Sequence, residues 1–121
     1  MILPDTSVWI DHARGEAPEL EGLLRQNVVA EHPFVLGELL LGAVRSRALL
    51  AQRLGTLLHA TKVRDQDVLT LIETARLHGS GIGYVDAHLL ASALGSKNCR
   101  LWTRDRKLAD QAARLGVTFA P

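Results

Sequence analysis

The chain contains few of the features that cross-link or anchor small proteins. Among its 121 residues there is a single cysteine, Cys99, so no internal disulfide can form and a reducing compartment is expected. The longest apolar run, residues 39–44, is far shorter than the roughly 20 residues that span a membrane. The few residues before Pro4 leave no room for a signal peptide. We therefore expect a soluble, cytoplasmic protein without membrane contact, folded as a single domain over residues 1–121.

An excess of charge of one sign is also missing. The chain has 14 basic and 13 acidic residues, which gives a formal net charge of +1, so its overall charge does not indicate a nucleic-acid-binding protein. Between Lys97 and Lys107, however, five cations accompany one acid, Asp105. This segment could follow a phosphate backbone, or it could be the solvated start of a helix, and the sequence favours neither interpretation.

Short apolar segments alternate with amphipathic stretches along the whole chain. Apolar spacing and capping residues predict helices that begin near Asp5 and near residues 16, 33, 46, 65, 85 and 105. The first strand should end before Pro4, because proline removes a ladder donor. Strands that alternate with helices form parallel sheets covered on both faces, so we predict an α/β fold with three layers, α/β/α, around a central, mostly parallel, short-stranded sheet. The predicted strands are residues 2–3, 28–30, 61–63, 100–103 and 117–119.

One acid, Glu38, falls within an apolar stretch, residues 34–42. On a helix its neighbours one turn away are Phe34 and Leu41, and no cation follows before Arg45. An unpaired buried carboxylate is costly, so we expect either a compensating cation or a side chain that reaches water at the helix edge.

Three aspartates are expected to lie near Glu38 in the folded chain. In βαβ units the first turn of a helix lies at the carboxyl edge of the sheet. Asp5 follows the first predicted strand, Asp105 follows the fourth, and Asp86 begins the helix that leads into the fourth. All four acids should therefore share one edge, although each aspartate could also be only a helix cap.

Four carboxylates at one edge repel one another unless a cation compensates them. Oxygen ligands without cysteine or paired histidines favour Mg²⁺ or Mn²⁺ over zinc. Such an ion can activate water and neutralise charge that develops on a phosphodiester. The set of Asp5, Glu38, Asp86 and Asp105 therefore predicts phosphodiester hydrolysis.

Four segments resemble the acidic motifs of PIN-domain ribonucleases, in particular the VapC-like toxins of toxin–antitoxin pairs. Each motif is short, but the four occur in the family's order and cover essentially the whole chain. They are residues 5–11 (DTSVWID), 35–42 (VLGELLLG), 84–92 (YVDAHLLAS) and 101–105 (LWTRD).

The resemblance implies a specific site and specific partners. The substrate is expected to be RNA, cut to 5′-phosphate and 3′-hydroxyl ends by an endoribonuclease, and the protein is expected to form a homodimer and to bind a VapB-like antitoxin. Ser7 and Thr103 are implied to give polar support near the metal. The implied ligands of Mg²⁺ or Mn²⁺ are the four acids Asp5, Glu38, Asp86 and Asp105.

Two other functions remain open at this stage. A phosphoacceptor signalling domain with an acidic metal rim needs a lysine at the end of a late strand, where this chain has Thr103, Arg104 and Asp105. A catalytically inactive, RNA-binding PIN domain keeps the fold without hydrolysis, and the complete set of four acids disfavours it.

Other segments are predicted to be structural. The glycine-rich residues 79–83 follow a helix and lack the lysine of a phosphate loop, so they are expected to connect two helices. His88 faces a different side of its helix from Asp86 and is expected to be structural. The leucine-rich residues 39–58 exceed the needs of one core face and could also form a groove for a partner's helix.

Overall fold

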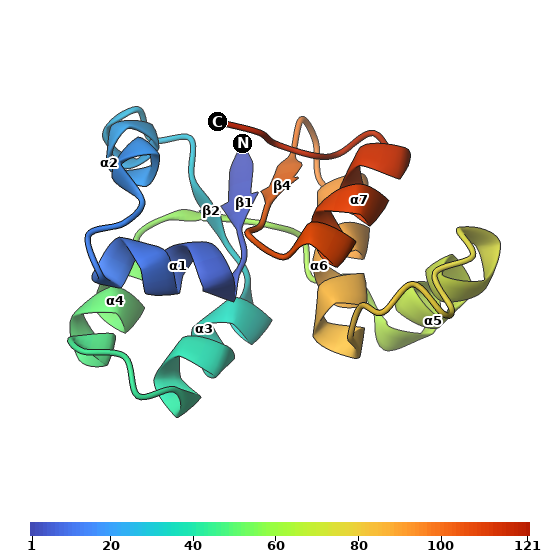
Figure 1. The fold of residues 1–121 in the computed structure, drawn as a ribbon, viewed down its shortest axis with the longest axis horizontal. Helices are drawn as coiled ribbons and strands as arrows, with labels where there is room; N and C mark the ends of the chain where they lie inside the picture. The colour runs from blue at the N-terminus through green and yellow to red at the C-terminus, as the bar shows by residue number, and fades with distance from the viewer.

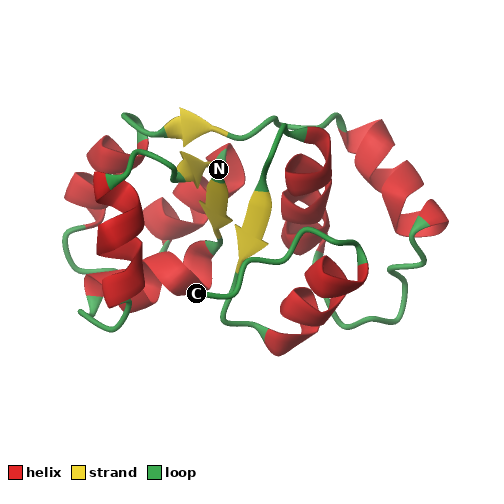
Figure 2. Cartoon of the chain, turned by 90° about the horizontal axis from the view of Figure 1, so that it is seen from above, coloured by secondary structure: helices red, strands yellow, loops and turns green.

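The computed structural model of the protein describes all residues, 1–121, as seven helices and four short strands (Figure 1). In chain order these are β1 (Ile2–Pro4), α1 (Thr6–Ala13), α2 (Pro18–Arg25), β2 (Ala30–Glu31), α3 (Pro33–Leu41), α4 (Arg47–Leu54), β3 (Leu58–His59), α5 (Asp65–Thr74), α6 (Tyr84–Gly95), β4 (Arg100–Trp102) and α7 (Arg106–Arg114). Helices α1 to α4 lie on one side of the strands and α5 to α7 on the other (Figures 1 and 2). None of the helices combines the length and apolar character that crossing a bilayer requires.

The strands pair in parallel. β1 pairs with β4 and β2 pairs with β3. An isolated parallel bridge between Ile2 and Val29 joins the two pairs, and a second bridge joins Leu101 to Thr118. The order across the sheet is therefore β3, β2, β1, β4 and then the segment around Thr118. This confirms the predicted α/β class with a central sheet of short, parallel strands.

The first strand is longer than predicted. Pro4 is the last residue of β1, opposite Trp102 of β4, rather than the first residue beyond the strand. The ladder toward β4 does not need a donor from Pro4, because the N–H of Asp5 donates to the carbonyl of Trp102 at 2.9 Å. Proline is therefore tolerated at the end of this strand.

The third strand lies earlier than predicted. It is Leu58–His59 rather than residues 61–63, because the N–H groups of Leu58 and Ala60 donate to carbonyls along the β2 segment at 3.3 and 3.0 Å. Thr61 has already left the sheet, and its N–H donates to Ser96 Oγ at 2.9 Å.

Several predicted elements are shorter in the structure. Helix α5 ends at Thr74, before the glycine-rich residues that the sequence predicted would follow it, and Arg76, with φ of 54°, adopts the left-handed conformation that often ends a helix. The strand predicted at residues 117–119 is reduced to the bridge at Thr118. These differences shift boundaries and leave the order of helices and strands unchanged.

The core holds the helices in fixed positions around the sheet. Trp9 of α1 and Trp102 of β4 are among the largest fully buried side chains, and the ring of Trp102 packs edge to face on Phe119 with centroids 5.5 Å apart. Helix α6 is buried along its length from residue 87 to residue 93. A helix packed on so many sides is a rigid support for the acid in its first turn.

Candidate active site

Asp5 lies at the carboxyl end of β1, and its side chain is held by three donors. It is 6% exposed and caps α1 by accepting the N–H of Val8 at 3.3 Å. The hydroxyls of Ser7 and Thr103 donate to its two carboxylate oxygens, each at 2.5 Å. Burial raises the pKa of Asp5 above its usual 3.8, and these hydrogen bonds oppose that rise. Because Thr103 follows β4, its bond to Asp5 joins the ends of two adjacent strands.

Glu38 does not occupy the environment suggested by its apolar neighbours. Its side chain is exposed, and Oε1 accepts a hydrogen bond from the Thr6 hydroxyl at 2.7 Å. The apolar stretch around it is only partly buried, since Leu41 is 90% exposed. The expectation of a buried charge packed against Phe34 and Leu41 is therefore wrong. Helix α3 presents Glu38 to water at its edge, which was the alternative.

Asp86 and Asp105 both cap helices, and both also face the same sheet edge. Asp86 Oδ2 accepts the N–H of Gly83 at 3.1 Å at the start of α6. Asp105 Oδ1 accepts the N–H of Lys107 at 2.9 Å at the start of α7. The N–H of Asp105 also donates to the hydroxyl of Thr103 at 2.9 Å, so Thr103 connects Asp105 to the carboxylate at the end of β1. Capping and membership of a shared site are therefore compatible in this fold.

The structure brings Asp5, Glu38, Asp86 and Asp105 together as an acidic cluster. Burial raises the pKa of Asp86 above 3.8, the Gly83 bond lowers it, and the negative charges of Asp5, Asp105 and Glu38 raise it further. No group of three or more carboxylate, imidazole or thiolate side chains is close enough to hold a metal ion by itself in this conformation. The acidic cluster is thus open rather than closed around a ready-made site.

Two residues that the sequence did not single out hold this edge together. Thr6 donates to Glu38, and the only signal for it was its place in a run of capping residues. Arg104 donates from Nε to Asp11 Oδ2 at 3.0 Å, and its main-chain N–H donates to Ser7 Oγ at 3.0 Å. Its guanidinium also lies over a buried indole of β4, 5.5 Å from the ring centroid. These contacts fasten the loop after β4 to helix α1.

A row of aromatic rings connects α3 with α6, the helices that carry two members of the acidic cluster. The ring centroids are 5.3 Å apart for His32 and Phe34, 4.6 Å for Phe34 and His88, and 4.8 Å for His88 and Tyr84. His88 is fully buried, as expected of a structural residue, and its Nε2 lies 3.2 Å from Asp65 Oδ1 without hydrogen-bond geometry. Burial lowers the pKa of His32 to about 4, so this ring stays neutral near pH 7.

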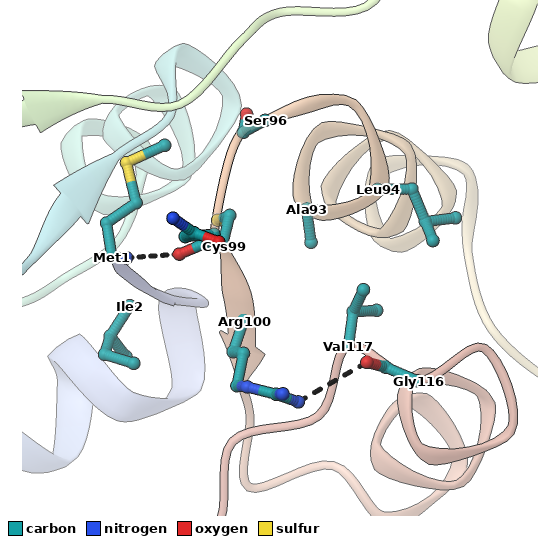
Figure 3. Close-up of a pocket in the computed structure, with 10 residues that line it drawn as sticks. Met1, Ile2, Ala93, Leu94, Ser96, Cys99, Arg100, Gly116 and Val117 are labelled. Atoms are coloured by element: carbon teal, nitrogen blue, oxygen red, sulfur yellow. Dashed lines mark hydrogen bonds between the residues drawn. The ribbon is translucent and has the colours of Figure 1, made fainter.

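A cavity of about 470 Å³ lies at the amino ends of β1 and β4, opposite the acidic cluster (Figure 3). Met1, Ile2 and Cys99 line it, and the Arg100 side chain points toward Gly116, to whose carbonyl it donates at 3.4 Å. None of the four carboxylates lines this cavity, so it is separate from the acidic cluster.

Comparisons with known proteins agree with this geometry. The family model described as PIN domain matches residues 2–114. Two relatives named Ribonuclease VapC32, from Mycobacterium tuberculosis strains CDC 1551 / Oshkosh and H37Rv, are each 42% identical over 120 residues, which covers 99% of this chain and 97% of the relative. The crystal structure of PAE2754 from Pyrobaculum aerophilum has a TM-score of 0.58 at 16% identity, covering 95% of this chain and 88% of that chain, and supports the fold alone.

These findings confirm the predicted fold and family. The relatives are matched over nearly their whole length, and they are ribonucleases by name, which favours the nuclease interpretation over a phosphoacceptor domain. The chain therefore belongs to the PIN-domain family, within its group of VapC ribonucleases.

Proposed function

We propose that this chain is a metal-dependent endoribonuclease that hydrolyses phosphodiester bonds of RNA and acts as the toxin of a VapBC-like toxin–antitoxin pair. In this proposal Asp5, Glu38, Asp86 and Asp105 bind Mg²⁺ or Mn²⁺. The observation that carries it is the meeting of four carboxylates from separate elements at one sheet edge, in a chain 42% identical to a named ribonuclease.

The side chains present fit a hard divalent cation. All four candidate ligands are carboxylates, and the single thiol, Cys99, lines the cavity at the opposite end of the sheet. Mg²⁺ retains several waters and takes only one or two carboxylates directly, which suits an acidic cluster whose members are spread apart. Asp5 already accepts two hydrogen bonds at Oδ1 and one at Oδ2, so an acceptor position remains at Oδ2.

Hydrogen bonds from neighbouring residues orient the carboxylates of the acidic cluster and favour the ionised form of one of them. A bound divalent ion supplies activation of water and neutralisation of charge on the phosphodiester. The hydroxyls of Ser7 and Thr103 fix the Asp5 carboxylate and favour its ionised form. Thr6 orients Glu38 in the same way, and a main-chain N–H at the start of α6 orients the carboxylate there.

The test is RNA cleavage by the Asp5→Asn variant. This change keeps the side-chain shape and part of the cap but removes a charge, so we expect the rate with Mg²⁺ or Mn²⁺ to fall by at least about 100-fold while the circular dichroism spectrum stays the same. Asp110→Asn, an exposed acid later in α7, is the matched control and should cleave normally. The assay uses a mixed RNA panel with Mg²⁺, with Mn²⁺ and with chelator. Cleavage by Asp5→Asn at the wild-type rate would overturn the assignment, and a wild type that binds RNA without cutting it would support an inactive RNA-binding domain.

The antitoxin is proposed to dock between α1 and the segment from α3 to α4. Two cavities of about 170 and 380 Å³ meet there and share Arg45 in their walls, and Leu49, which lines the smaller one, is 66% exposed. The leucine-rich segment does not form a groove along its whole length. Leu50 and Leu54 are 7% and 0% exposed and belong to the core.

Three further statements are part of the proposal. The protein forms a homodimer, it acts in the cytoplasm, and residues 1–121 form a single domain. The last is supported by one buried cluster of 23 residues that extends from Leu3 to Val117. Light scattering in solution tests the homodimer.

A further inference from the structure

Tyr84 is the only exposed side chain among the tryptophan, phenylalanine and tyrosine residues of the protein. The chain has two tryptophans, two phenylalanines and this tyrosine, and both tryptophans are buried. Phe34 and Phe119 are partly buried, whereas Tyr84 is 46% exposed. A more exposed ring than the chain's other large aromatic side chains, two residues before Asp86 of the acidic cluster, suggests a ligand.

The position of this ring is fixed relative to the acidic cluster. Tyr84 is the first residue of α6, two residues before Asp86, and the N–H of the preceding Gly83 donates to the Asp86 carboxylate. The Tyr84 ring packs edge to face, at 88°, on the ring of His88, which is fully buried. The ring is thus supported from below, and it loses little further freedom when a flat ligand stacks on it.

A hollow of about 200 Å³ adjoins the ring between the 79–83 loop and α6. Its walls are mainly apolar, which suits the face of an uncharged aromatic group better than a phosphate. The residues that line it include Ile72, Leu77, His78, Ile82 and Tyr84.

A cation packs on the same loop. The Lys107 stem packs so closely on Gly81 that a Cβ at Gly81 would lie 2.8 Å from Lys107 Cδ. No acid lies within ion-pair distance of the Lys107 ammonium. An unpaired cation on the loop that leads into an exposed ring is a combination with which proteins hold single-stranded nucleic acid, the ring by stacking a base and the cation by contacting the backbone.

We propose that Tyr84 is a stacking platform for one nucleobase of single-stranded RNA, and that Lys107 contacts a phosphate next to that base. This inference rests on the proposed ribonuclease function and names a substrate-binding subsite of the same site. The subsite sets which segment of an RNA strand lies along the acidic cluster.

The experiment measures the affinity of full-length protein for a short, fluorescently labelled single-stranded RNA in chelator, where no cleavage occurs. Tyr84→Ala and Tyr84→Leu should each weaken binding at least about fivefold, whereas Tyr84→Phe and Tyr84→Trp should bind like the wild type, because stacking needs only the ring. Leu94→Ala is the matched control, since Leu94 is 43% exposed at the far end of the same helix. With 2-aminopurine in the RNA, fluorescence should be quenched by the wild type and not by Tyr84→Ala.

Four outcomes decide against the inference, and a fifth separates it from the proposed catalysis. Unchanged affinity of Tyr84→Ala, a loss in Tyr84→Phe equal to that in Tyr84→Ala, or no RNA binding by the wild type would overturn it. A loss that accompanies dissociation of a dimer, seen by analytical ultracentrifugation, would make Tyr84 an interface residue instead. Binding that depends on the ring, in a wild type that cuts no RNA with Mg²⁺ or Mn²⁺, would overturn the proposed catalysis while supporting the stacking subsite.

Discussion

Asp86 carries a charge that its surroundings disfavour in the absence of metal. Its folded pKa lies above 3.8 because the side chain is partly buried and three other carboxylates are near. As the pH rises through 3.8, the unfolded chain releases this proton before the folded protein does, so the folded state loses stability until its own pKa is passed. The ionised acidic cluster therefore destabilises the metal-free fold near neutral pH, and a bound cation would offset this repulsion.

We expect Asp86→Asn to be more stable than the wild type in metal-free buffer at pH 7, by a few tenths to about 1 kcal/mol. The advantage should shrink as the pH is lowered toward 3.8, and added Mg²⁺ should reduce it because the ion binds the folded wild type. Urea unfolding over a series of pH values, with and without Mg²⁺, measures both effects. A difference between the two proteins that stays constant with pH would contradict this account.

Single residues also show where sequence reasoning reached its limit. The alternation of strands and helices was enough to predict that Glu38 shares an edge with Asp5. The burial of the Glu38 side chain was predicted wrongly. Helical spacing does not reveal which apolar residues of a helix pack against the rest of the protein, and Leu41 does not, since it is 90% exposed. The bond from Thr6 to Glu38 spans 32 positions, so no local pattern could have indicated it.

At the scale of elements, the glycines of the 79–83 loop allow both a left-handed backbone and the close packing of the Lys107 side chain. Gly79 and Gly81 both have positive φ, 74° and 88°, which favours glycine at both. A Cβ at Gly79 would meet nothing within 4 Å, whereas one at Gly81 would meet the Lys107 stem at 2.8 Å. The two glycines therefore form a matched pair that separates backbone strain from displacement of the lysine.

We expect Gly79→Ala and Gly81→Ala each to lose about 1 kcal/mol of unfolding free energy from the left-handed backbone. Only Gly81→Ala should also weaken RNA binding, because the added methyl group pushes Lys107 out of its position over the loop. Urea unfolding and RNA binding in chelator, measured on the same samples, give the two quantities. Equal RNA affinities for the two variants would show that the packing of Lys107 on the loop has no role in binding.

Elements were predicted well in kind and order and less well in their ends. Helices were predicted well because the spacing of apolar residues within a few turns indicates them, and this spacing can be read from the sequence. The third strand was misplaced because residues 57–63 are mixed in character throughout, and the pairing of Leu58 and Ala60 with β2 selects the strand. The end of α5 was misplaced because the chain already turns left-handed at Arg76, three residues before the first glycine of the loop.

At the scale of the whole molecule, topology does more than any single motif. A parallel sheet with the order β3, β2, β1, β4 brings the starts of several helices to one edge, and this rule converts distant acids into a cluster. The opposite edge carries the separate cavity around Arg100. These topological rules do not identify a binding partner, because the pattern of one chain does not specify the surface of another protein.

The last prediction concerns the surface proposed for the antitoxin. Leu49 is 66% exposed and lines a cavity of about 170 Å³ together with His12 and Arg45, whereas the next residue, Leu50, is 7% exposed. Leu49→Asp should weaken binding of the product of the neighbouring upstream reading frame by at least about tenfold, since it places a charge in an apolar contact, and should leave unfolding free energy and RNA cleavage unchanged.

Leu50→Ala is the contrasting variant on the same helix. It removes core volume, so it should lower the unfolding free energy by about 2–5 kcal/mol and impair binding and cleavage together. Co-purification and isothermal titration calorimetry measure the complex, urea unfolding measures stability, and the RNA panel measures activity. If Leu49→Asp binds the partner as tightly as the wild type, the antitoxin docks elsewhere. If it unfolds like Leu50→Ala, the exposed side of α4 contributes to folding rather than to recognition.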